Sequence, residues 1–165
     1  MKSCVFAGTF DPITTGHQDI ILGLSKTYQK VIVVIGQNPQ KECFFTENER
    51  LQLLNECFKD IDNVECCLYS DYKDGYSEFL QSEGVSVYAR GIRDKKDLDF
   101  EKKMEELNKT IYPYITTEYI FCKPQFALVS STLVKDKILS GQEFLSLVPT
   151  PCHTLIKSIL EKKIK

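Results

Sequence analysis

Short apolar runs alternate along the chain with longer segments in which apolar residues recur every three or four positions. The short runs have the length and composition of buried β-strands and lie at residues 2–7, 30–36, 64–68, 85–89 and 117–122. The segments between and after them have helical spacing and lie at about residues 16–28, 47–58, 75–83, 97–112, 131–140, 143–148 and 152–163. Before the second of these helices, Thr46 and Glu49 have the spacing of a capping box.

Strands that alternate with helices predict a parallel sheet joined by right-handed crossovers. We therefore expect an α/β fold, a Rossmann-like, doubly wound, five-stranded parallel sheet with C-terminal helices. A chain of this length suits one domain, so we treat residues 1–165 as a single unit in which a helical layer at about 131–163 closes the sheet. Ligands of such sheets bind beyond the carboxyl ends of the strands. The loops in that position are 8–16, 37–45, 69–76, 90–96 and 123–131.

The composition argues against two classes of protein, those that bind nucleic acid and those that span a membrane. Apolar residues make up 42% of the chain and charged residues 27%, with a net charge of −2. This balance argues against a protein held to nucleic acid by counterion release, which needs a basic face. No apolar run approaches the roughly 18 residues of a membrane helix, and the N-terminal residues lack a signal-peptide pattern. We expect a cytoplasmic protein that binds neither nucleic acid nor membrane, and that meets any anionic ligand with a local cluster of cations.

Seven cysteines favour free thiols over disulfides or a metal site. Their number is odd, and the C-x-x-C spacing of many zinc sites does not occur. Four of them fall in predicted strands: Cys4, Cys66, Cys67 and Cys122. Small core thiols of a cytosolic protein fit this distribution. We expect no disulfide and no metal-binding residues.

The sequence "GTFDPITTGH" marks the first strand-to-helix corner. Gly8 allows the backbone to approach a ligand closely, and Pro12 stiffens the turn. Thr15 can cap the following helix, with Gln18 as a weaker capping-box partner. His17 then lies in the first helical turn, where the positive end of the dipole favours a phosphate and disfavours a charged imidazole. The plain alternative is a polar turn with a solvated histidine, but the whole string at this corner favours a polyphosphate site.

Three other loops carry candidate phosphate ligands. In "RGIR", Arg90 and Arg93 flank Gly91 directly after the fourth strand, and arginine forks match phosphate oxygens. The alternative is a pair of surface arginines neutralised by the acidic run that follows. Lys41, in "NPQKECFFTENER", taken alone is an ordinary solvated lysine.

The serines of "FALVSST" precede a helix. Ser130, Ser131 and their amides can therefore form a second helix start that faces an anion. Simple N-capping is the alternative, and the two roles are compatible.

These motifs, in this order and spacing, resemble a known family. "GTFDPITTGH" is similar to the signature of nucleotidylyltransferases that share a T-x-G-H or H-x-G-H motif with class I aminoacyl-tRNA synthetases. From residue 4 to about residue 150 the chain resembles the bacterial phosphopantetheine adenylyltransferases, through that string, "FTENER", "RGIR", "DLDFE" and "SSTLVK". Ala7 stands where the family usually has proline, and Thr15 where it has asparagine.

The resemblance implies an activity and a set of site residues. It implies transfer of the adenylyl group of ATP to 4′-phosphopantetheine, with Mg²⁺ as cofactor, in a homohexamer. It assigns catalysis to His17, Lys41 and Arg93. It assigns ATP binding to Thr9, Phe10, His17, Gly91, Ile92, Arg93, Glu101, Phe126, Ala127, Leu128, Val129, Ser130, Ser131 and Thr132. It assigns acceptor binding to Thr9, Lys41, Tyr76 and Arg90.

The motif loops contain no activated serine or cysteine paired with a base. The reaction above requires none, because the acceptor phosphate is itself the nucleophile. One rival is a sibling enzyme with nicotinamide mononucleotide or glycerol 3-phosphate as acceptor, against which Lys41, "RGIR" and "SSTLVK" argue together. Another is a noncatalytic nucleotide-binding module, which would be expected to lack one of His17, Lys41 and Arg93.

Overall fold

The computed structural model describes residues 2–165. At its centre lies a five-stranded sheet in which every neighbouring pair of strands is parallel. The strands are β1 (Ser3–Gly8), β2 (Lys30–Ile35), β3 (Val64–Leu68), β4 (Val85–Ile92) and β5 (Thr116–Phe121), in the spatial order β3-β2-β1-β4-β5. The chain winds outward through β2 and β3 and then returns to the other side of β1. The predicted doubly wound fold is confirmed, and its topological switch point lies between β1 and β4.

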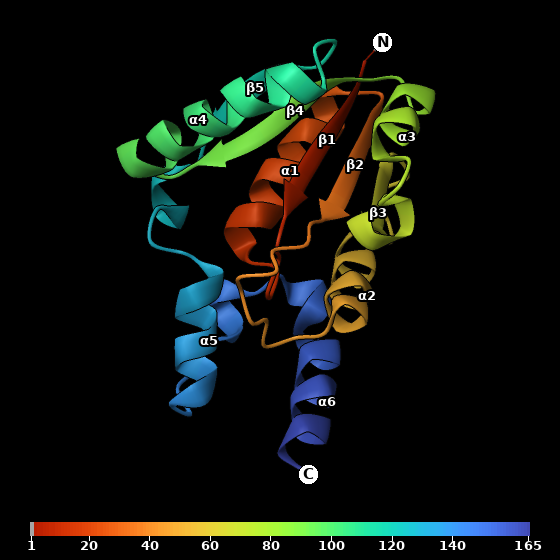
Figure 1. Ribbon diagram of the computed structural model, residues 1–165. Helices are drawn as coiled ribbons and strands as arrows, with labels where there is room; N and C mark the ends of the chain where they lie inside the picture. Colours follow the sequence, from red (N-terminus) through yellow and green to blue (C-terminus); the bar gives the residue numbers. More distant parts are fainter. Residues whose placement is uncertain (1) are drawn as a thin grey trace.

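Six α-helices accompany the sheet within the described residues (Figure 1). They are α1 (Thr15–Thr27), α2 (Glu47–Phe58), α3 (Tyr76–Ser82), α4 (Lys95–Ile111), α5 (Ser131–Leu139) and α6 (His153–Ile164). The helix expected at 143–148 is wrong, because only a 3₁₀ turn forms at Leu145–Leu147. The segment between Gly141 and Pro149 is too short to propagate a stable α-helix. None of the helices within residues 2–165 combines the length and apolar character that crossing a bilayer requires.

The hydrophobic core has two parts, one on each face of the sheet. Strand β2 is apolar on both faces: Val33 packs into the larger part of the core, and Ile32 and Val34 pack into the smaller part. A strand buried on both faces has no place for alternating polar residues. Helices α1 and α2 contribute to the larger part and α3 to the smaller.

Strand β4 is longer than its apolar pattern predicts. Residues Arg90, Gly91 and Ile92 were expected in a loop, but they pair in register with Tyr119, Ile120 and Phe121 of β5. A Cβ added at Gly91 would lie 2.8 Å from Cδ1 of Ile20, so the glycine allows α1 to approach the strand. Arg93 is therefore the first of the "RGIR" residues beyond the sheet.

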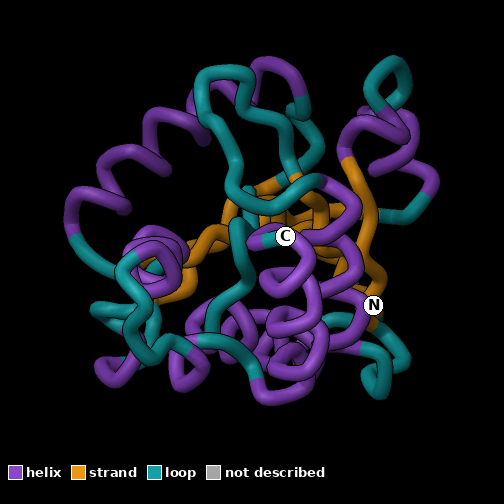
Figure 2. The backbone as a smooth tube through the Cα atoms, turned by 90° about the horizontal axis from the view of Figure 1, so that it is seen from below, coloured by secondary structure: helices purple, strands orange, loops and turns teal. Residues whose placement is uncertain are grey.

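The C-terminal helices extend past the carboxyl edge of the sheet (Figure 1). Val134, Val148 and Ile156 join the larger core, and α6 packs against α2. Viewed from below, the C-terminal end lies in front of the sheet (Figure 2). The end of the chain thus borders the edge where a ligand of this fold binds.

Candidate active site

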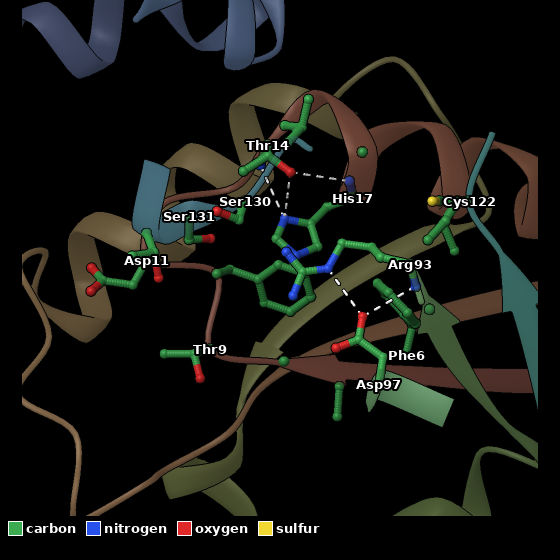
Figure 3. Close-up of a pocket in the computed structure, with 18 of the residues that line it drawn as sticks. Phe6, Thr9, Asp11, Thr14, His17, Arg93, Asp97, Cys122, Ser130 and Ser131 are labelled. Carbon is green, nitrogen blue, oxygen red and sulfur yellow. Dashed lines mark hydrogen bonds and ion pairs between the residues drawn. The ribbon is translucent and has the colours of Figure 1, made fainter. Parts of the chain in front are cut away.

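A cleft of about 520 Å³ lies at the carboxyl edge of the sheet, at the switch point. Segments far apart in the sequence form its walls: the loop after β1, the loop after β2, the end of β4 and the start of α5. Most of the predicted site residues line it: Thr9, Phe10, His17, Lys41, Arg90, Gly91, Arg93, Glu101, Phe126, Val129, Ser130, Ser131 and Thr132. Figure 3 shows the central part of this cleft.

Four predicted residues lie outside the lining of the cleft. Ile92 is buried in the core, whereas the side chain of Leu128 is 87% exposed. Ala127 ends a 3₁₀ turn. Tyr76 packs edge-on against Tyr69 within the smaller core. The ligand contacts assigned to these four residues remain predictions.

His17 takes part in the start of helix α1. The N-cap is Thr14 rather than the expected Thr15, and its hydroxyl accepts a hydrogen bond from the His17 N–H at 3.3 Å. In return, the Thr14 N–H donates to His17 Nδ1 at 3.1 Å. The imidazole thus replaces the glutamate or glutamine of an ordinary capping box. Thr14 caps because the imidazole can reach the N–H of that residue.

The same contact fixes the tautomer of His17. Since Nδ1 accepts a hydrogen bond, the proton of the neutral ring resides on Nε2, which is left as a donor. Burial, together with the smaller effect of the positive charge of Arg93, lowers the pKa of His17 from its ordinary 6.5 to about 4. Figure 3 shows Arg93 beside the imidazole. His17 is therefore a neutral hydrogen-bond donor near pH 7, for reasons of burial and a neighbouring cation rather than of the helix dipole alone.

Packing holds the imidazole from one side. The ring of Phe10 meets it edge-to-face, with ring centroids 5.0 Å apart. A Cβ added at Gly8 would lie 3.1 Å from the Phe10 ring. Gly8 thus makes room for Phe10 and also lines the cleft, and the close approach of a ligand to its backbone stays a prediction.

Two arginines stand at the end of β4, each beside a carboxylate of α4. Arg90 Nε lies 3.3 Å from Glu101 Oε2, and its guanidinium stacks 4.2 Å from the centre of the Tyr88 ring. Burial raises the pKa of Glu101, while the charge of Arg90 opposes that rise. Arg93 is more exposed and its Nε lies 3.1 Å from Asp97 Oδ2.

Helix α5 begins at the opposite wall of the cleft. The Ser130 hydroxyl is the N-cap and accepts from the N–H of Leu133 at 3.1 Å. The Ser131 hydroxyl donates to the Pro12 carbonyl at 2.7 Å. Ser130 thus caps the helix, Ser131 fixes the helix start against the loop after β1, and the backbone N–H groups of this start border the cleft.

Comparisons with known proteins agree with this geometry. The cytidylyltransferase-like family model matches residues 5–137. A phosphopantetheine adenylyltransferase from Lactobacillus johnsonii is 33% identical over 165 residues, which cover 100% of this chain and 96% of that protein. One from Thermotoga neapolitana is 32% identical, with 96% of this chain and 98% of that protein covered. The chain belongs to the phosphopantetheine adenylyltransferase family.

A solved structure supports the fold. It is a bifunctional NMN adenylyltransferase/ADP ribose pyrophosphatase from Francisella tularensis, complexed with AMP and a manganese ion. It superposes with a TM-score of 0.63 at 17% identity and covers 90% of this chain. This chain spans 44% of that larger protein. The likeness shows a shared fold.

Some residues that line the cleft were not among those predicted for this phosphopantetheine adenylyltransferase family member. They include Asp11, Thr14, Asp97, Cys122 and Lys135. All of these but Cys122 lie within quoted motifs, so a signal for them was present. Cys122 was expected in strand β5 but lies one residue beyond it, and its N–H donates to the Ile92 carbonyl at 2.9 Å.

The arrangement is suited to stabilising negative charge. Within residues 2–165, no serine or cysteine of the lining hydrogen-bonds to a histidine or carboxylate. The walls of the cleft instead carry the neutral N–H donor of His17, several cationic side chains and the start of helix α5. These are the groups that phosphoryl and nucleotidyl transfer uses for positioning and charge stabilisation.

Proposed function

We propose that this chain transfers the adenylyl group of ATP to 4′-phosphopantetheine, giving dephospho-coenzyme A and pyrophosphate, by direct in-line attack. One observation carries the proposal: in this family member, the cleft gathers His17, Lys41 and Arg93 from three separate segments. An oxygen of the acceptor phosphate forms the new bond to the α-phosphorus of ATP. The bond from that phosphorus to the bridging oxygen breaks, and pyrophosphate leaves with the electron pair.

The three residues have complementary parts in this step. His17 Nε2 donates to an oxygen of the α-phosphate, where charge redistributes in the transition state. Lys41 contacts both the acceptor phosphate and the α-phosphate and so aligns them. Arg93 binds the nucleotide phosphates together with the N–H groups at the start of α5. No proton needs to be removed from the acceptor, so a general base is unnecessary.

The acceptor half of the cleft is assigned to Arg90, with Thr9 and Lys41. The contacts of Arg90 with Glu101 and Tyr88 hold its guanidinium in one orientation. The resemblance assigns Glu101 to ATP binding. The ion pair between Arg90 and Glu101 therefore connects the acceptor half of the cleft with the ATP half.

Mg²⁺ is proposed to enter as the complex with ATP. Within residues 2–165, no group of three or more histidine, cysteine or acidic side chains is placed to hold a metal ion. Of the four carboxylates that line the cleft in the described part of the chain, Asp11, Asp97 and Glu101 each face a lysine or arginine, and only Glu42 does not. The phosphates of ATP therefore supply most of its ligands, and the ion neutralises phosphate charge.

Self-association as a homohexamer in the cytoplasm is part of the proposal, on the strength of the family resemblance. Helix α4 supports it, because none of its residues is buried. Phe100, Leu107 and Ile111 on this helix are each about 60% exposed, and Phe121 at the end of β5 is 66% exposed. An apolar surface of this kind favours contact with a second copy of the chain.

The decisive experiment incubates the chain with Mg-ATP and 4′-phosphopantetheine. We expect pyrophosphate and dephospho-coenzyme A in equal amounts, measured by a coupled pyrophosphate assay and by mass spectrometry. Parallel reactions with nicotinamide mononucleotide or glycerol 3-phosphate plus CTP test the sibling activities. Turnover with one of those acceptors alone would reassign the substrate, and binding of ATP without any product would indicate a noncatalytic module.

A further inference from the structure

Two charged side chains are buried at the cleft, one in its wall and one behind it. Asp11 is 2% exposed and Arg50, in helix α2, is 5% exposed. Charges removed from water are costly unless polar groups satisfy them. Both residues belong to motifs of the sequence, "FDP" and "FTENER", and the proposed chemistry uses neither side chain.

Their partners are backbone groups of the two loops that carry substrate ligands. Asp11 Oδ1 accepts from the Phe45 N–H at 2.8 Å, and Oδ2 accepts from the Phe44 N–H at 2.9 Å. Arg50 Nε donates to the Phe45 carbonyl at 3.1 Å, and Nη1 donates to the Thr9 carbonyl at 2.8 Å. The backbone at Phe45 is therefore held on both sides by opposite charges. We call these two side chains the Asp11–Arg50 clamp.

The clamp also reaches the third wall of the cleft. Lys135 of helix α5 places its Nζ 3.0 Å from Asp11 Oδ2. In Figure 3 the Asp11 carboxylate points away from His17. One carboxylate thus connects the loop after β1, the loop after β2 and helix α5, without itself facing the donor that His17 presents.

Lys41 depends on this anchoring more than the other site residues do. It lies on an exposed loop, where its N–H donates to the Asn38 carbonyl at 3.0 Å. Among residues 2–165, no acidic side chain forms an ion pair with its ammonium. The backbone that follows Lys41 is held in place at Phe44 and Phe45, the first of which is three residues downstream. Displacement of that segment would displace Lys41.

We infer that the Asp11–Arg50 clamp is a positioning device for Lys41. It holds the Lys41 loop in register with the start of α1, so that the ammonium meets the α-phosphate near His17. A displacement of about 1 Å can lower a rate a hundredfold, because catalysis of this kind rests on alignment. The inference rests on the proposed function, since it assigns Lys41 a catalytic role. Asp11 and Arg50 act through the backbone and touch no reacting atom.

A double-mutant cycle tests the inference. Asp11→Asn removes the negative charge and one good acceptor, and we expect kcat to fall about ten- to a hundredfold with smaller changes in KM. In a Lys41→Ala background the same substitution should lower kcat less than about twofold, because the group it positions is gone. In a His17→Asn background the full fall should persist. Equal falls in all three backgrounds would overturn the inference.

A matched control and a second readout separate positioning from a general loss of fold. Asp19→Asn removes a carboxylate that also pairs with a lysine, Lys123, but has no contact with the Lys41 loop, so kcat should stay within about twofold of the wild type. Amide hydrogen exchange should accelerate at residues 43–46 in Asp11→Asn and stay unchanged there in Asp19→Asn. Unchanged exchange at 43–46 in Asp11→Asn contradicts the inference.

Two further outcomes are distinguishable. If Asp11→Asn does not fold, Arg50→Lys replaces it in the cycle, because an ammonium cannot reach both carbonyls and the same non-additivity is expected. If the wild-type protein forms no product, the proposed function fails. The exchange measurement then still tests whether the clamp orders the loop.

Discussion

His17 has two tasks that involve different nitrogens of one ring. Nδ1 accepts the Thr14 N–H and completes the cap of helix α1, while Nε2 is left to donate into the cleft. From the sequence, an exposed histidine at a helix start would be expected to matter for catalysis and hardly for folding. The structure shows instead that its side chain supports the helix start. Function and stability can be separated by choosing substitutions that keep or remove each nitrogen's role.

The first prediction compares two substitutions of His17. His17→Ala removes both roles, so kcat should fall about a hundredfold or more, and the free energy of unfolding should drop by about 1 kcal/mol. His17→Asn keeps a short acceptor near the Thr14 N–H, so kcat should fall as far with a smaller loss of stability. Steady-state kinetics and thermal unfolding measure both quantities. Near wild-type kcat in either variant would contradict the assigned role.

The second prediction concerns pH. The folded protein holds the pKa of His17 at about 4, below the 6.5 of the unfolded chain. Between these values the unfolded chain binds more protons, so this residue makes stability fall as the pH drops from about 6.5 to about 4. Above pH 6.5 it has no such effect. Melting temperatures from pH 7.5 to 4.5 should therefore decline less steeply for His17→Asn than for the wild type; parallel curves would exclude the effect.

At the level of elements, the end of β4 carries the two arginines that we assign to different substrates. Arg90 lies within the strand and pairs with Glu101, whereas Arg93 follows the strand and pairs with Asp97. Both carboxylates come from helix α4, so one helix orients both arginines. Pairing with β5 fixes the backbone from Arg90 to Ile92, so the strand determines where the two arginine side chains leave the backbone.

The third prediction divides the cationic site. A charge-assisted contact to phosphate is worth about ten- to a hundredfold in affinity. Arg93→Ala should weaken ATP binding by that factor and leave phosphopantetheine binding nearly unchanged. Arg90→Ala should do the reverse, with a smaller loss for ATP because Glu101 loses its neighbouring cation. Calorimetric titration with one ligand at a time measures this; equal losses of the same ligand in both variants would refute the division.

Local sequence determined those elements whose signals lie within one segment. Helix α2 begins and ends as predicted, because Thr46 and Glu49 form the expected capping box. Strand β2 follows its apolar run almost to the residue. The extension of β4 could not be predicted in this way, since its hydrogen-bond partners in β5 are distant in the sequence.

For the candidate site too, only features whose signal lies within one segment could be predicted. Motif strings predicted His17, Lys41 and Arg93, which do line one cleft. The pairing of Asp11 with the backbone at Phe45, and of Arg50 with the carbonyl of Thr9, depends on loops that only the fold brings together. No spacing rule within one segment could indicate such contacts.

At the level of the whole molecule, helix α4 has no buried residue along its whole length. Its residues Phe100, Leu107 and Ile111 are exposed, although the helix lies along β4 and β5 at the edge of the sheet (Figure 1). A single chain leaves this face in water, where apolar area is unfavourable. The proposed homohexamer would cover it.

The fourth prediction follows from that face. Leu107→Glu places a charge at its centre, so light scattering should show a smaller assembly than the wild type forms. Lys157→Glu, on the exposed side of α6, serves as a charge-change control and should leave the mass unchanged. A wild-type protein that is monomeric at all concentrations, or a Leu107→Glu variant of wild-type mass, would argue against α4 as the contact.

The fixed tautomer of His17 also bears on the direction of the reaction. A ring whose Nδ1 is engaged by the Thr14 N–H cannot pass a proton from one nitrogen to the other during turnover. The proposed enzyme then leaves each cycle in the protonation state in which it entered, ready to accept either pair of substrates. The same contacts that accelerate synthesis accelerate pyrophosphorolysis by the same factor. The net direction is then set by the concentrations of the substrates and products alone.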